Sequence, residues 1–451
     1  MAPTDVSQPT PAALRIDPVR VAVATLLVLI PITAACGPYL LPINVGGVTL
    51  YAFRTIVLCA LPLLLTLAGG RVPLTKSSLW FFSTMYAWLV WGSASLLWTP
   101  DPRIGATEVI TLVFGSAAAL VVVLGCELVP NGIEYVRRGW LLAYLASAAV
   151  AVWELRTHQH LQSSFTERTP DYAQGVLVST FGNPNNYAAF IVLAFPFLLW
   201  SAATGRGIGR AFAALLCLTA PLLLILTAGR LALLAMMLEL AGMVALQWRV
   251  GRHGALRMFL AVAVLGLVAA VALRESPGTL EKITRINGEL RHGGSTSIRL
   301  NLFINSLQLA VDSHGLGTGA GSFEQMIASG HGALPTMGAI NPHNFWMEIL
   351  AQYGVLVFAL IVGWSLYACL LVIKLLTSTV GKSASMRWPL QATALALLGY
   401  SFAAVENSRF IPQPSNWAFL ASIASLVSCL SRRAMDSQSA DIFLSQTGDR
   451  A

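Results

Sequence analysis

Residues suited to anion binding and proton transfer stand at the edges of the apolar runs of this chain. Arg230 lies where one long apolar stretch turns back on itself, and Arg299 opens a helical pattern within the one long polar segment, residues 274–345. His343 comes directly before the next apolar run. Guanidinium groups offer several N–H donors to an anion, and a neutral imidazole accepts a proton. The pattern indicates a site that holds an anionic group and moves a proton at the rim of a membrane.

The composition predicts an all-α, polytopic transmembrane helical bundle. Of the 451 residues, 56% are apolar and 11% are charged, whereas about 25% are charged in soluble proteins. A bilayer core needs about 20 apolar residues per helix, and it forces each backbone polar group to bond within the protein. The net charge of +8 comes from Lys and Arg dispersed over short loops, which argues against nucleic acid as a partner.

The cysteines give no sign of a metal site or a disulfide framework. All six lie in or beside apolar runs, none forms a C-x-x-C pair, and none falls in the long polar segment. The other histidines lack metal-ligand spacing. We therefore expect no metal and no cofactor.

Hydropathy predicts about twelve transmembrane helices. They cover residues 19–36, 48–68, 79–97, 108–127, 136–155, 185–203, 211–227, 230–248, 256–273, 346–373, 388–405 and 416–430. The seventh and eighth are separated only by Thr227-Ala228-Gly229-Arg230, a tight hairpin tip. The division expected is a disordered cytoplasmic tail at 1–18, a transmembrane domain at 19–430, and a cytoplasmic C-terminal tail at 431–451. The first apolar run lacks a small-residue cleavage site, so we expect it to be retained.

Basic residues alternate between the loops and predict the orientation. Loops of one set carry the pairs and triplets Arg15 and Arg20; Arg71 and Lys76; Arg137 and Arg138; Arg206 and Arg210; Arg249, Arg252 and Arg257; Lys374, Lys382 and Arg387; Arg432 and Arg433. The short loops of the other set hold at most one basic residue each, such as Arg103 or Arg409. Positively charged loops remain in the cytoplasm. Both termini are therefore expected inside, with the hairpin tip and the 274–345 extracytoplasmic loop, including its short amphipathic helices, outside.

Arg299 heads an amphipathic helix, residues 297–312. Asn301, Asn305, Gln308 and Asp312 form its polar stripe, and Leu300, Phe303, Ile304, Leu307 and Val311 form its apolar face. Arg299 falls opposite the polar stripe, on the side expected to be buried, where an unpaired guanidinium is costly. It needs an anionic partner, which is a substrate or, in a purely structural ion pair, a loop carboxylate such as Glu324 or Glu289. Four glycines at alternate positions follow this helix, at 315, 317, 319 and 321, and indicate close backbone packing.

Several further side chains are candidates for substrate contact. His343 begins a helix, whose positive end favours the neutral imidazole, and Asn344 and Glu348 are placed to orient the ring or a sugar hydroxyl. At the tip, Arg230 is either an interfacial anchor or, together with its helix N-terminus, an anion site. Asn183 and Asn185 introduce the sixth span, where they can cap the helix or touch a sugar. Arg54, inside the second span, is a functional candidate or a side chain that reaches out to the interface.

These residues resemble the O-antigen ligase and O-antigen polymerase superfamily of bacterial membrane proteins. The resemblance covers roughly residues 180–375. It is carried by Phe181-Gly182-Asn183-Pro184-Asn185-Asn186-Tyr187-Ala188, by Leu226-Thr227-Ala228-Gly229-Arg230, by the Arg299–Phe323 segment, and by Pro342-His343-Asn344-Phe345-Trp346-Met347-Glu348-Ile349-Leu350-Ala351-Gln352-Tyr353-Gly354. The chain has Ser313-His314-Gly315-Leu316 where relatives usually have a His-Pro pair.

The resemblance implies an extracytoplasmic, metal-independent inverting glycosyltransferase in the bacterial inner membrane. Its donor would be an undecaprenyl-diphosphate-linked glycan, and its acceptor a hydroxyl of a lipid, the wall or another glycan. Arg230 and Arg299 would hold the diphosphate, and His343 would activate or orient the acceptor. Ligase and polymerase differ only in the acceptor, so both stay open, with a ligase-like activity favoured.

Two other classes remain. A transporter for bicarbonate or a lipid-linked sugar would need ionisable groups near the bilayer midplane, where Glu239 is the one carboxylate. A non-catalytic scaffold of a glycan assembly complex would tolerate alanine substitution of Arg230, Arg299 and His343.

Overall fold

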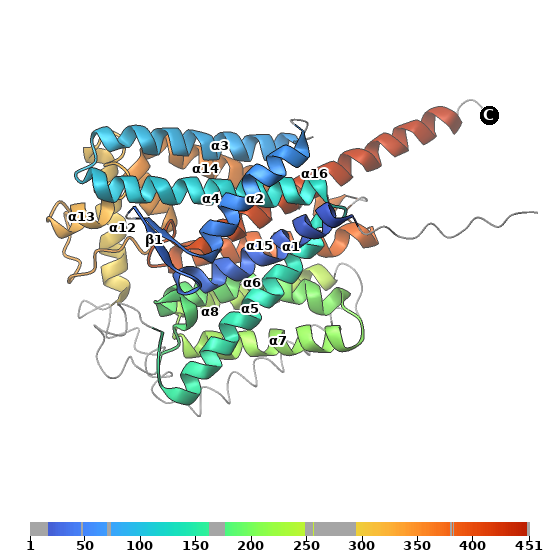
Figure 1. Ribbon diagram of the computed structural model, residues 1–451, viewed down its shortest axis with the longest axis horizontal. Coiled ribbons are helices and arrows are strands. Elements are labelled where there is room, and N and C mark those ends of the chain that lie inside the picture. Colours follow the sequence, from blue (N-terminus) through green and yellow to red (C-terminus); the bar gives the residue numbers. More distant parts are fainter. Residues whose placement is uncertain are drawn as a thin grey trace, which may run out of the picture.

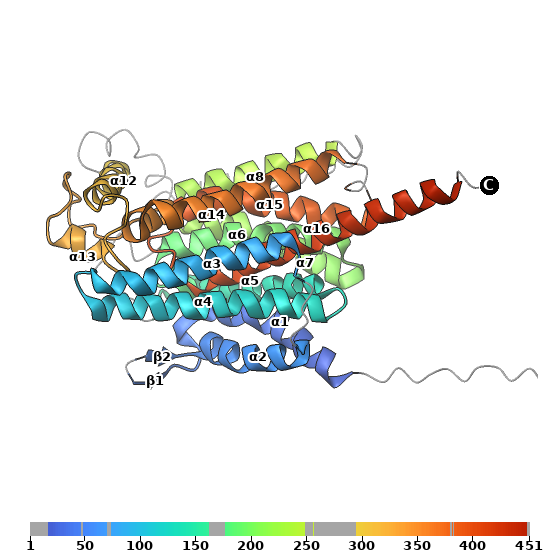
Figure 2. The same ribbon diagram turned by 90° about the horizontal axis from the view of Figure 1, so that it is seen from above.

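The protein is a bundle of long helices that run side by side along one direction (Figures 1 and 2). The computed structural model describes residues 17–46, 48–69, 74–161, 176–248, 295–378 and 383–448, with the single residues 256 and 381. The helices described are α1 (Pro18–Cys36), α2 (Ala52–Ala68), α3 (Lys76–Ala94), α4 (Pro102–Leu128), α5 (Gly132–Thr157), α6 (Pro184–Thr204), α7 (Gly207–Leu226), α8 (Arg230–Trp248), α12 (Ser295–Asp312), α13 (Phe323–Ala328), α14 (Phe345–Thr377), α15 (Ala384–Glu406) and α16 (Pro414–Gly448). Short 3-10 turns lie at η1 (Gly37–Tyr39), η2 (Ser95–Leu97) and η4 (Ser179–Phe181).

The fold is an all-α polytopic membrane protein, as predicted. Within the described residues, eight helices are long and apolar enough to cross a membrane, and α2 is a shorter apolar helix. Each predicted span except the ninth coincides with a helix, and the predicted boundaries of α8 match the observed ones. The ninth predicted span, 256–273, lies outside the described residues apart from position 256.

Proline and short polar residues determine where several helices begin. Asp101 accepts hydrogen bonds from the N–H groups of Arg103 and Ile104 at the start of α4, which opens on Pro102. Asn183 caps α6 in the same way, ahead of Pro184. These side chains satisfy N–H groups that have no partner inside the helix, and proline lacks one of them. These polar caps therefore determine where the apolar helices α4 and α6 begin.

Helix α6 occupies the centre of the bundle. Nearly all its side chains from Pro184 to Ser201 are buried, and it packs against α5, α7, α8 and α15. Trp140 of α5 stacks on Phe197 at a centroid distance of 5.2 Å and meets Phe419 of α16 edge-on. The indole N–H of Trp140 donates to Ser422 at 2.9 Å, so this buried ring has a polar partner. These contacts hold α6 between α5 and α16 in the core.

The second span begins later than predicted, at Ala52 and not at residue 48. Strands β1 (Ile43–Val45) and β2 (Val48–Leu50) form a short antiparallel hairpin before α2. Val45, Val48 and Thr49 are β-branched residues that favour strands, and an apolar composition alone does not separate a short strand from a helix end. Arg54 consequently lies in the first turn of α2.

Helix α12 lies crosswise at one end of the bundle, the left in both views (Figures 1 and 2). Its predicted apolar face is not the packed one. Leu300, Phe303, Ile304, Leu307 and Val311 are exposed, whereas the buried side comprises Leu302, Asn305, Ser306, Leu309 and Ala310. Buried Asn305 is satisfied because its side chain donates to the carbonyl of Leu334 and accepts from the N–H of the same residue. A membrane protein can leave apolar side chains on its outer surface, so periodicity did not identify the buried side.

The glycine-rich turn after α12 fits into a break in α14. Gly354 has φ 75° and ψ −174°, outside the helical region. There the N–H of Gly319 donates to the carbonyl of Gln352, and that of Val355 donates to the carbonyl of Gly315. A Cβ at Gly317 (φ +85°) would lie 2.4 Å from the carbonyl oxygen of Gln352. The predicted close backbone packing is confirmed.

Gly317→Ala is expected to destabilise the fold strongly, because it adds a steric clash to an unfavourable positive φ. Gly330→Ala is the matched control, since Gly330 has φ +81° and nothing within 4 Å of its Cβ position. The control isolates the backbone cost, about 1 kcal/mol. Thermal unfolding of the detergent-solubilised variants should show a clearly larger loss for Gly317→Ala; equal losses would show that the turn is not tightly packed.

Candidate functional site

The loop between α15 and α16, residues 407–413, connects the elements at this end of the bundle. We call it the rim loop. The N–H and the hydroxyl of Ser408 both donate to Oδ1 of Asn186, at 3.0 and 2.9 Å. The carbonyl of Ser408 accepts from the N–H of His343 at 3.1 Å, and Phe410 packs on the ring of Phe345 with centroids 4.1 Å apart. The rim loop therefore holds the start of α6 and the start of α14 together.

Arg299 finds its anionic partner at the end of α15. Its Nη1 donates to Oε2 of Glu406 at 3.3 Å, and the Arg299 side chain keeps 28% exposure while that of Glu406 has 2%. The expectation of an anionic partner is confirmed, but the partner is neither of the two carboxylates named from the sequence. Glu324 pairs with Arg409 instead, and Glu289 lies outside the described residues.

The hairpin tip that carries Arg230 reaches the same carboxylate. A Cβ built on Gly229 would lie 3.2 Å from Oε1 of Glu406 and 2.8 Å from Cβ of Ala188. Arg230 is the first residue of α8, as expected. Glu406 thus lies between Arg299 and the backbone beside Arg230, so the structure brings both arginines to one end of the bundle.

His343 lies beside Arg299 in a strained backbone conformation. Its φ is +47°, a region that non-glycine residues seldom adopt. Burial, and to a smaller extent the nearby Arg299 charge, lower the pKa of His343 to about 4. The imidazole is therefore neutral near pH 7, for a cause different from the helix end invoked from the sequence. Its Nδ1 is buried and has no hydrogen-bond partner in the described part of the protein.

The other residues predicted to contact substrate mostly make hydrogen bonds within the protein. Asn344 caps α14 by accepting from the N–H groups of Trp346 and Met347. Asn183 caps α6 by accepting from the N–H of Asn185 at 2.8 Å, which confirms the capping role. Asn185 itself is half-buried, and Asn186, which the sequence did not single out, makes the contact to Ser408.

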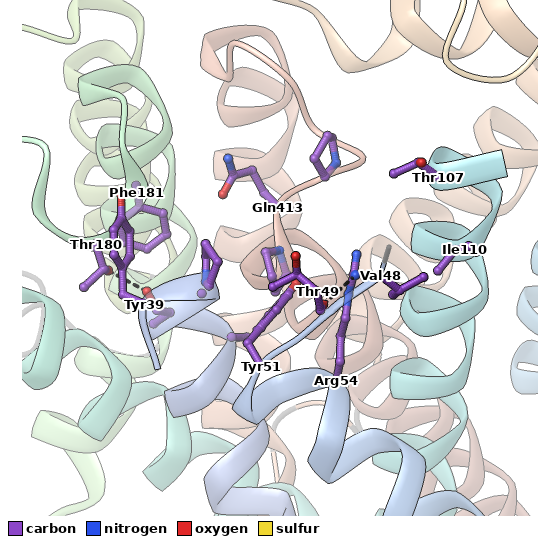
Figure 3. A pocket seen from close by; sticks show the side chains of 16 residues that line it. Tyr39, Val48, Thr49, Tyr51, Arg54, Thr107, Ile110, Thr180, Phe181 and Gln413 are labelled. Atoms are coloured by element: carbon purple, nitrogen blue, oxygen red, sulfur yellow. Dashed lines mark hydrogen bonds between the residues drawn. The ribbon is translucent and has the colours of Figure 1, made fainter. Parts of the chain in front are cut away.

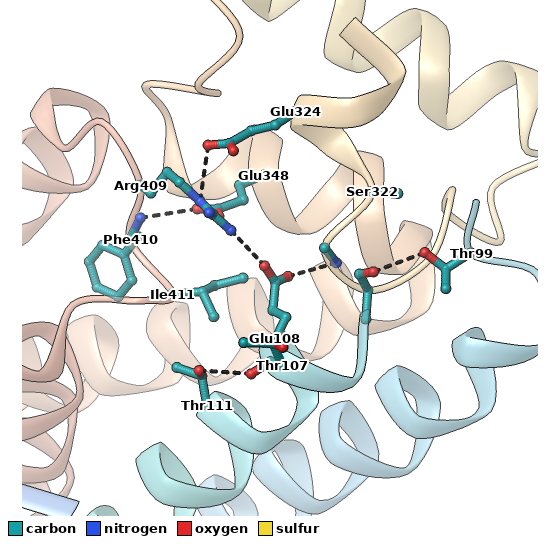
Figure 4. A network of polar contacts seen from close by, with 12 residues as sticks. Thr99, Thr107, Glu108, Thr111, Ser322, Glu324, Glu348, Arg409, Phe410 and Ile411 are labelled. Atoms are coloured by element: carbon teal, nitrogen blue, oxygen red, sulfur yellow. Dashed lines mark hydrogen bonds and ion pairs between the residues drawn. The ribbon is translucent and has the colours of Figure 1, made fainter. Parts of the chain in front are cut away.

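Glu348 belongs to a buried polar network around Arg409 (Figure 4). Arg409 donates to Oε2 of Glu108 at 2.8 Å and lies 3.3 Å from Oε1 of Glu324. Glu348 accepts from the N–H of Phe410 at 3.1 Å, so its carboxylate faces this network, with no bond to the ring of His343. Oε1 of Glu108 also accepts from Tyr353 and from the N–H of Gly321. The network locks the rim loop to α4, α14 and the glycine-rich turn.

Arg54 lines a separate pocket on the other side of the start of α4 (Figure 3). It donates to the carbonyl of Thr49 at 2.9 Å and to the hydroxyl of Thr111 at 3.2 Å. Its guanidinium also lies over the rings of Tyr51 and Phe114, at 5.1 and 4.9 Å. The structure does not place Arg54 in contact with Arg299 or His343.

The arrangement suits the transfer of a group that leaves as an anion. The Arg299 charge lies near a neutral imidazole, at a rim where buried carboxylates fix the backbone, and Arg230 opens α8 at the same end of the bundle. Among the residues that the structure describes, no cluster of three or more His, Cys, Asp or Glu side chains is arranged to hold a metal ion.

The sequence missed the residues that position the site, chiefly Glu406, Arg409, Glu108 and Asn186. Each lies at the edge of an apolar run, and its partner lies far away along the chain. An available signal was the pairing of unusual charges: a carboxylate within an otherwise apolar helix implies a buried cation nearby.

Comparisons with known proteins agree with this picture. A family model described as O-antigen ligase matches residues 212–362, which include Arg230, Arg299 and His343. The chain is also 24% identical over 370 residues to a curated relative, the teichuronic acid biosynthesis protein TuaE of Bacillus subtilis (strain 168). That alignment covers 79% of this chain and 72% of the relative.

The helices define a multi-pass membrane protein, and the comparisons support a role in cell-surface polysaccharide biosynthesis of the O-antigen ligase or polymerase type. The chain is therefore similar to proteins of the O-antigen ligase and O-antigen polymerase superfamily.

Arg409→Met should destabilise the protein because it leaves Glu108, only 4% exposed, without its cation. Breaking a buried ion pair from one side costs about 3 to 5 kcal/mol, and we expect the lower end because Arg409 is partly exposed. The double variant Arg409→Met/Glu108→Gln should recover part of the loss in thermal unfolding. A double variant less stable than the single one would contradict the pairing.

Stability should fall as pH decreases from about 6.5 to 4, in part because of His343. Its folded-state pKa is below the unfolded value, so the unfolded chain binds the proton first and acid favours unfolding. Above pH 6.5 this residue contributes no pH dependence. His343→Asn, which tolerates the positive φ, should lose less thermal stability between pH 7.5 and 4.5 than the parent; equal losses would show that the histidine titrates normally.

Proposed function

We propose that the protein transfers a glycan from an undecaprenyl diphosphate carrier to an acceptor hydroxyl, at the outer face of a bacterial inner membrane. The observation that carries this proposal is the meeting of Arg299, the Arg230 tip and neutral His343 around Glu406 and Ser408. The match to the O-antigen ligase model over these same residues supports it.

The two arginines stabilise the leaving group. When the bond between the anomeric carbon and the diphosphate breaks, negative charge grows on the diphosphate oxygens. Arg299 uses one N–H for Glu406 and keeps donors of its partly exposed guanidinium for the substrate. A well-placed donor in such a site is worth about 3 to 4 kcal/mol in the transition state. These guanidinium groups supply the positive charge, so the proposed reaction needs no metal ion.

His343 takes the acceptor proton. The acceptor oxygen attacks the anomeric carbon, its proton passes to the imidazole, and undecaprenyl diphosphate departs from the opposite face. The configuration at that carbon is therefore inverted. A base with a pKa of about 4 is weak, so its proton affinity must rise as negative charge develops beside it. The adjacent diphosphate, which offsets the Arg299 charge, provides that rise.

The membrane orientation follows from the basic loops. Lys and Arg of the alternate loops mark the cytoplasmic side, and both termini lie there. The division into an N-terminal tail, a transmembrane domain and a C-terminal tail goes with this orientation, although α16 continues as a helix to Gly448.

The acceptor decides between ligase and polymerase. Attachment to a lipid or wall anchor defines a ligase, and extension of the carrier-linked chain defines a polymerase. The relative's role in teichuronic acid biosynthesis fits either step. The transporter alternative is less well supported, because such a protein would need several ionisable groups near the bilayer midplane, where the sequence places Glu239 alone, whereas the pairs Arg299–Glu406 and Arg409–Glu108 lie at the outer rim.

Purified protein in liposomes, supplied with an undecaprenyl-diphosphate-linked oligosaccharide and an acceptor, tests the proposal. His343→Ala should lower the transfer rate about 10²- to 10⁴-fold, and Arg299→Ala about 10²- to 10³-fold. His331→Ala and Arg103→Ala, at exposed positions, are the matched controls and should transfer normally. Mass analysis of the product identifies the acceptor. Transfer by His343→Ala at the parental rate would refute the assignment.

A further inference from the structure

The pocket around Arg54 is a second polar feature at the same end of the bundle. It has a cavity volume of about 410 Å³, within the usual range of small-molecule sites. Its walls come from the turn after α1, from β2, from the start of α4 and from the rim loop with the first residue of α16. Figure 3 shows Arg54, Tyr51, Thr107 and Gln413 around this space.

The pocket is continuous with the elements of the transfer site. Thr180 and Phe181, which line it, immediately precede the Asn183–Pro184 start of α6. Pro412 and Gln413, on another wall, end the rim loop whose Ser408 contacts His343. A ligand in this pocket therefore touches the segments that hold the catalytic groups, from the other side.

The chemistry of the walls matches a sugar. The rings of Tyr39, Tyr51 and Phe181 offer flat apolar surfaces, and the side chains of Thr49, Thr107 and Gln413 offer hydroxyl and amide groups. Sites of this kind combine aromatic surface with a few polar groups that fix the ligand's orientation. A carbohydrate presents both C–H faces and hydroxyl groups, so it can use both parts of the wall.

Arg54 adds a requirement for negative charge. Of the described residues that line the pocket, Arg54 alone is charged. Arg299 and Arg409 each have a carboxylate partner, whereas Arg54 is held by a carbonyl, a hydroxyl and two aromatic rings. A guanidinium has five N–H donors, and only two of them are used by these hydrogen bonds. The side chain is thus fixed in place with donors left for an anion.

We propose that the Arg54 pocket binds an acidic sugar residue, one that carries a carboxylate, within the glycan that the protein handles. The inference rests on the proposed glycan transfer and adds its substrate class. The carboxylate meets Arg54, and the sugar ring lies against the tyrosines. In this position the pocket selects glycans by charge, one or more residues away from the bond that reacts.

Binding of two matched probes tests this inference: methyl β-D-glucuronide and methyl β-D-glucoside, which differ in a carboxylate against a hydroxymethyl group. Ligand-observed NMR with the full chain in phosphatidylcholine nanodiscs measures both dissociation constants. The glucuronide should bind about 10-fold more tightly or better, since a hydrogen bond to a charged group is worth that factor. Equal binding of the two probes would overturn the inference.

Variants locate the effect. Arg54→Gln should abolish the preference for the glucuronide, while Arg103→Gln, an exposed arginine of the same helix end as Thr107, should keep it. Thr107→Phe leaves Arg54 in place and narrows the pocket, so it should lower the affinity for both probes. A preference that survives in Arg54→Gln would place the acidic sugar elsewhere.

Two further measurements distinguish an acidic sugar from a lipid headgroup, and ligand binding from glycan transfer. If phosphatidylglycerol in the nanodisc displaces the glucuronide, and Arg54→Gln reduces the bound phosphatidylglycerol in native mass spectrometry, the site belongs to a lipid headgroup and the inference fails. Binding is measured without turnover. A protein that binds the glucuronide through Arg54 but transfers no glycan would therefore refute the proposed function while the acidic-sugar site stands.

Discussion

The ion pair between Arg299 and Glu406 is the contact on which the rest of the site depends. Glu406 has only 2% exposure, and a carboxylate removed from water is costly unless a cation and hydrogen bonds compensate. Arg299 provides that compensation from α12, a helix that lies outside the main bundle. The pair therefore ties the crosswise helix to the end of α15, and the rim loop that follows carries this order to Ser408 and His343.

A second principle is that the backbone at this end is held by carboxylates rather than by regular structure. Glu108 accepts from the N–H of Gly321, and Glu348 accepts from that of Phe410. Loops without helical hydrogen bonds need such partners when they are buried. Arg409 neutralises part of the resulting charge. Most of these charged side chains therefore hold the backbone in place. Arg54 differs from them because its partners are a carbonyl, a hydroxyl and two aromatic rings.

The sequence was enough to predict the helices and the main charged residues, but not the contacts between them. Apolar length identifies a span because lipid imposes it, and this located α8 and the tip before Arg230. The same reasoning failed at β1 and β2, where a few apolar residues fit strand and helix equally. It also failed for the faces of α12, because lipid makes apolar exposure acceptable. Glu406 and Arg299 are separated by 107 positions, and nothing in a single sequence reports such a pairing.

The break at Gly354 has a mechanical consequence. Helix α14 is not one rod: its first part, from Phe345, is fastened to the glycine-rich turn, whereas its remainder runs on through the bilayer. Membranes of different thickness are accommodated by helix tilt. A break at this depth lets the longer part of α14 tilt without rotating the shorter part. The orientation of His343, which precedes the shorter part, is therefore preserved when the surrounding lipid thins or thickens.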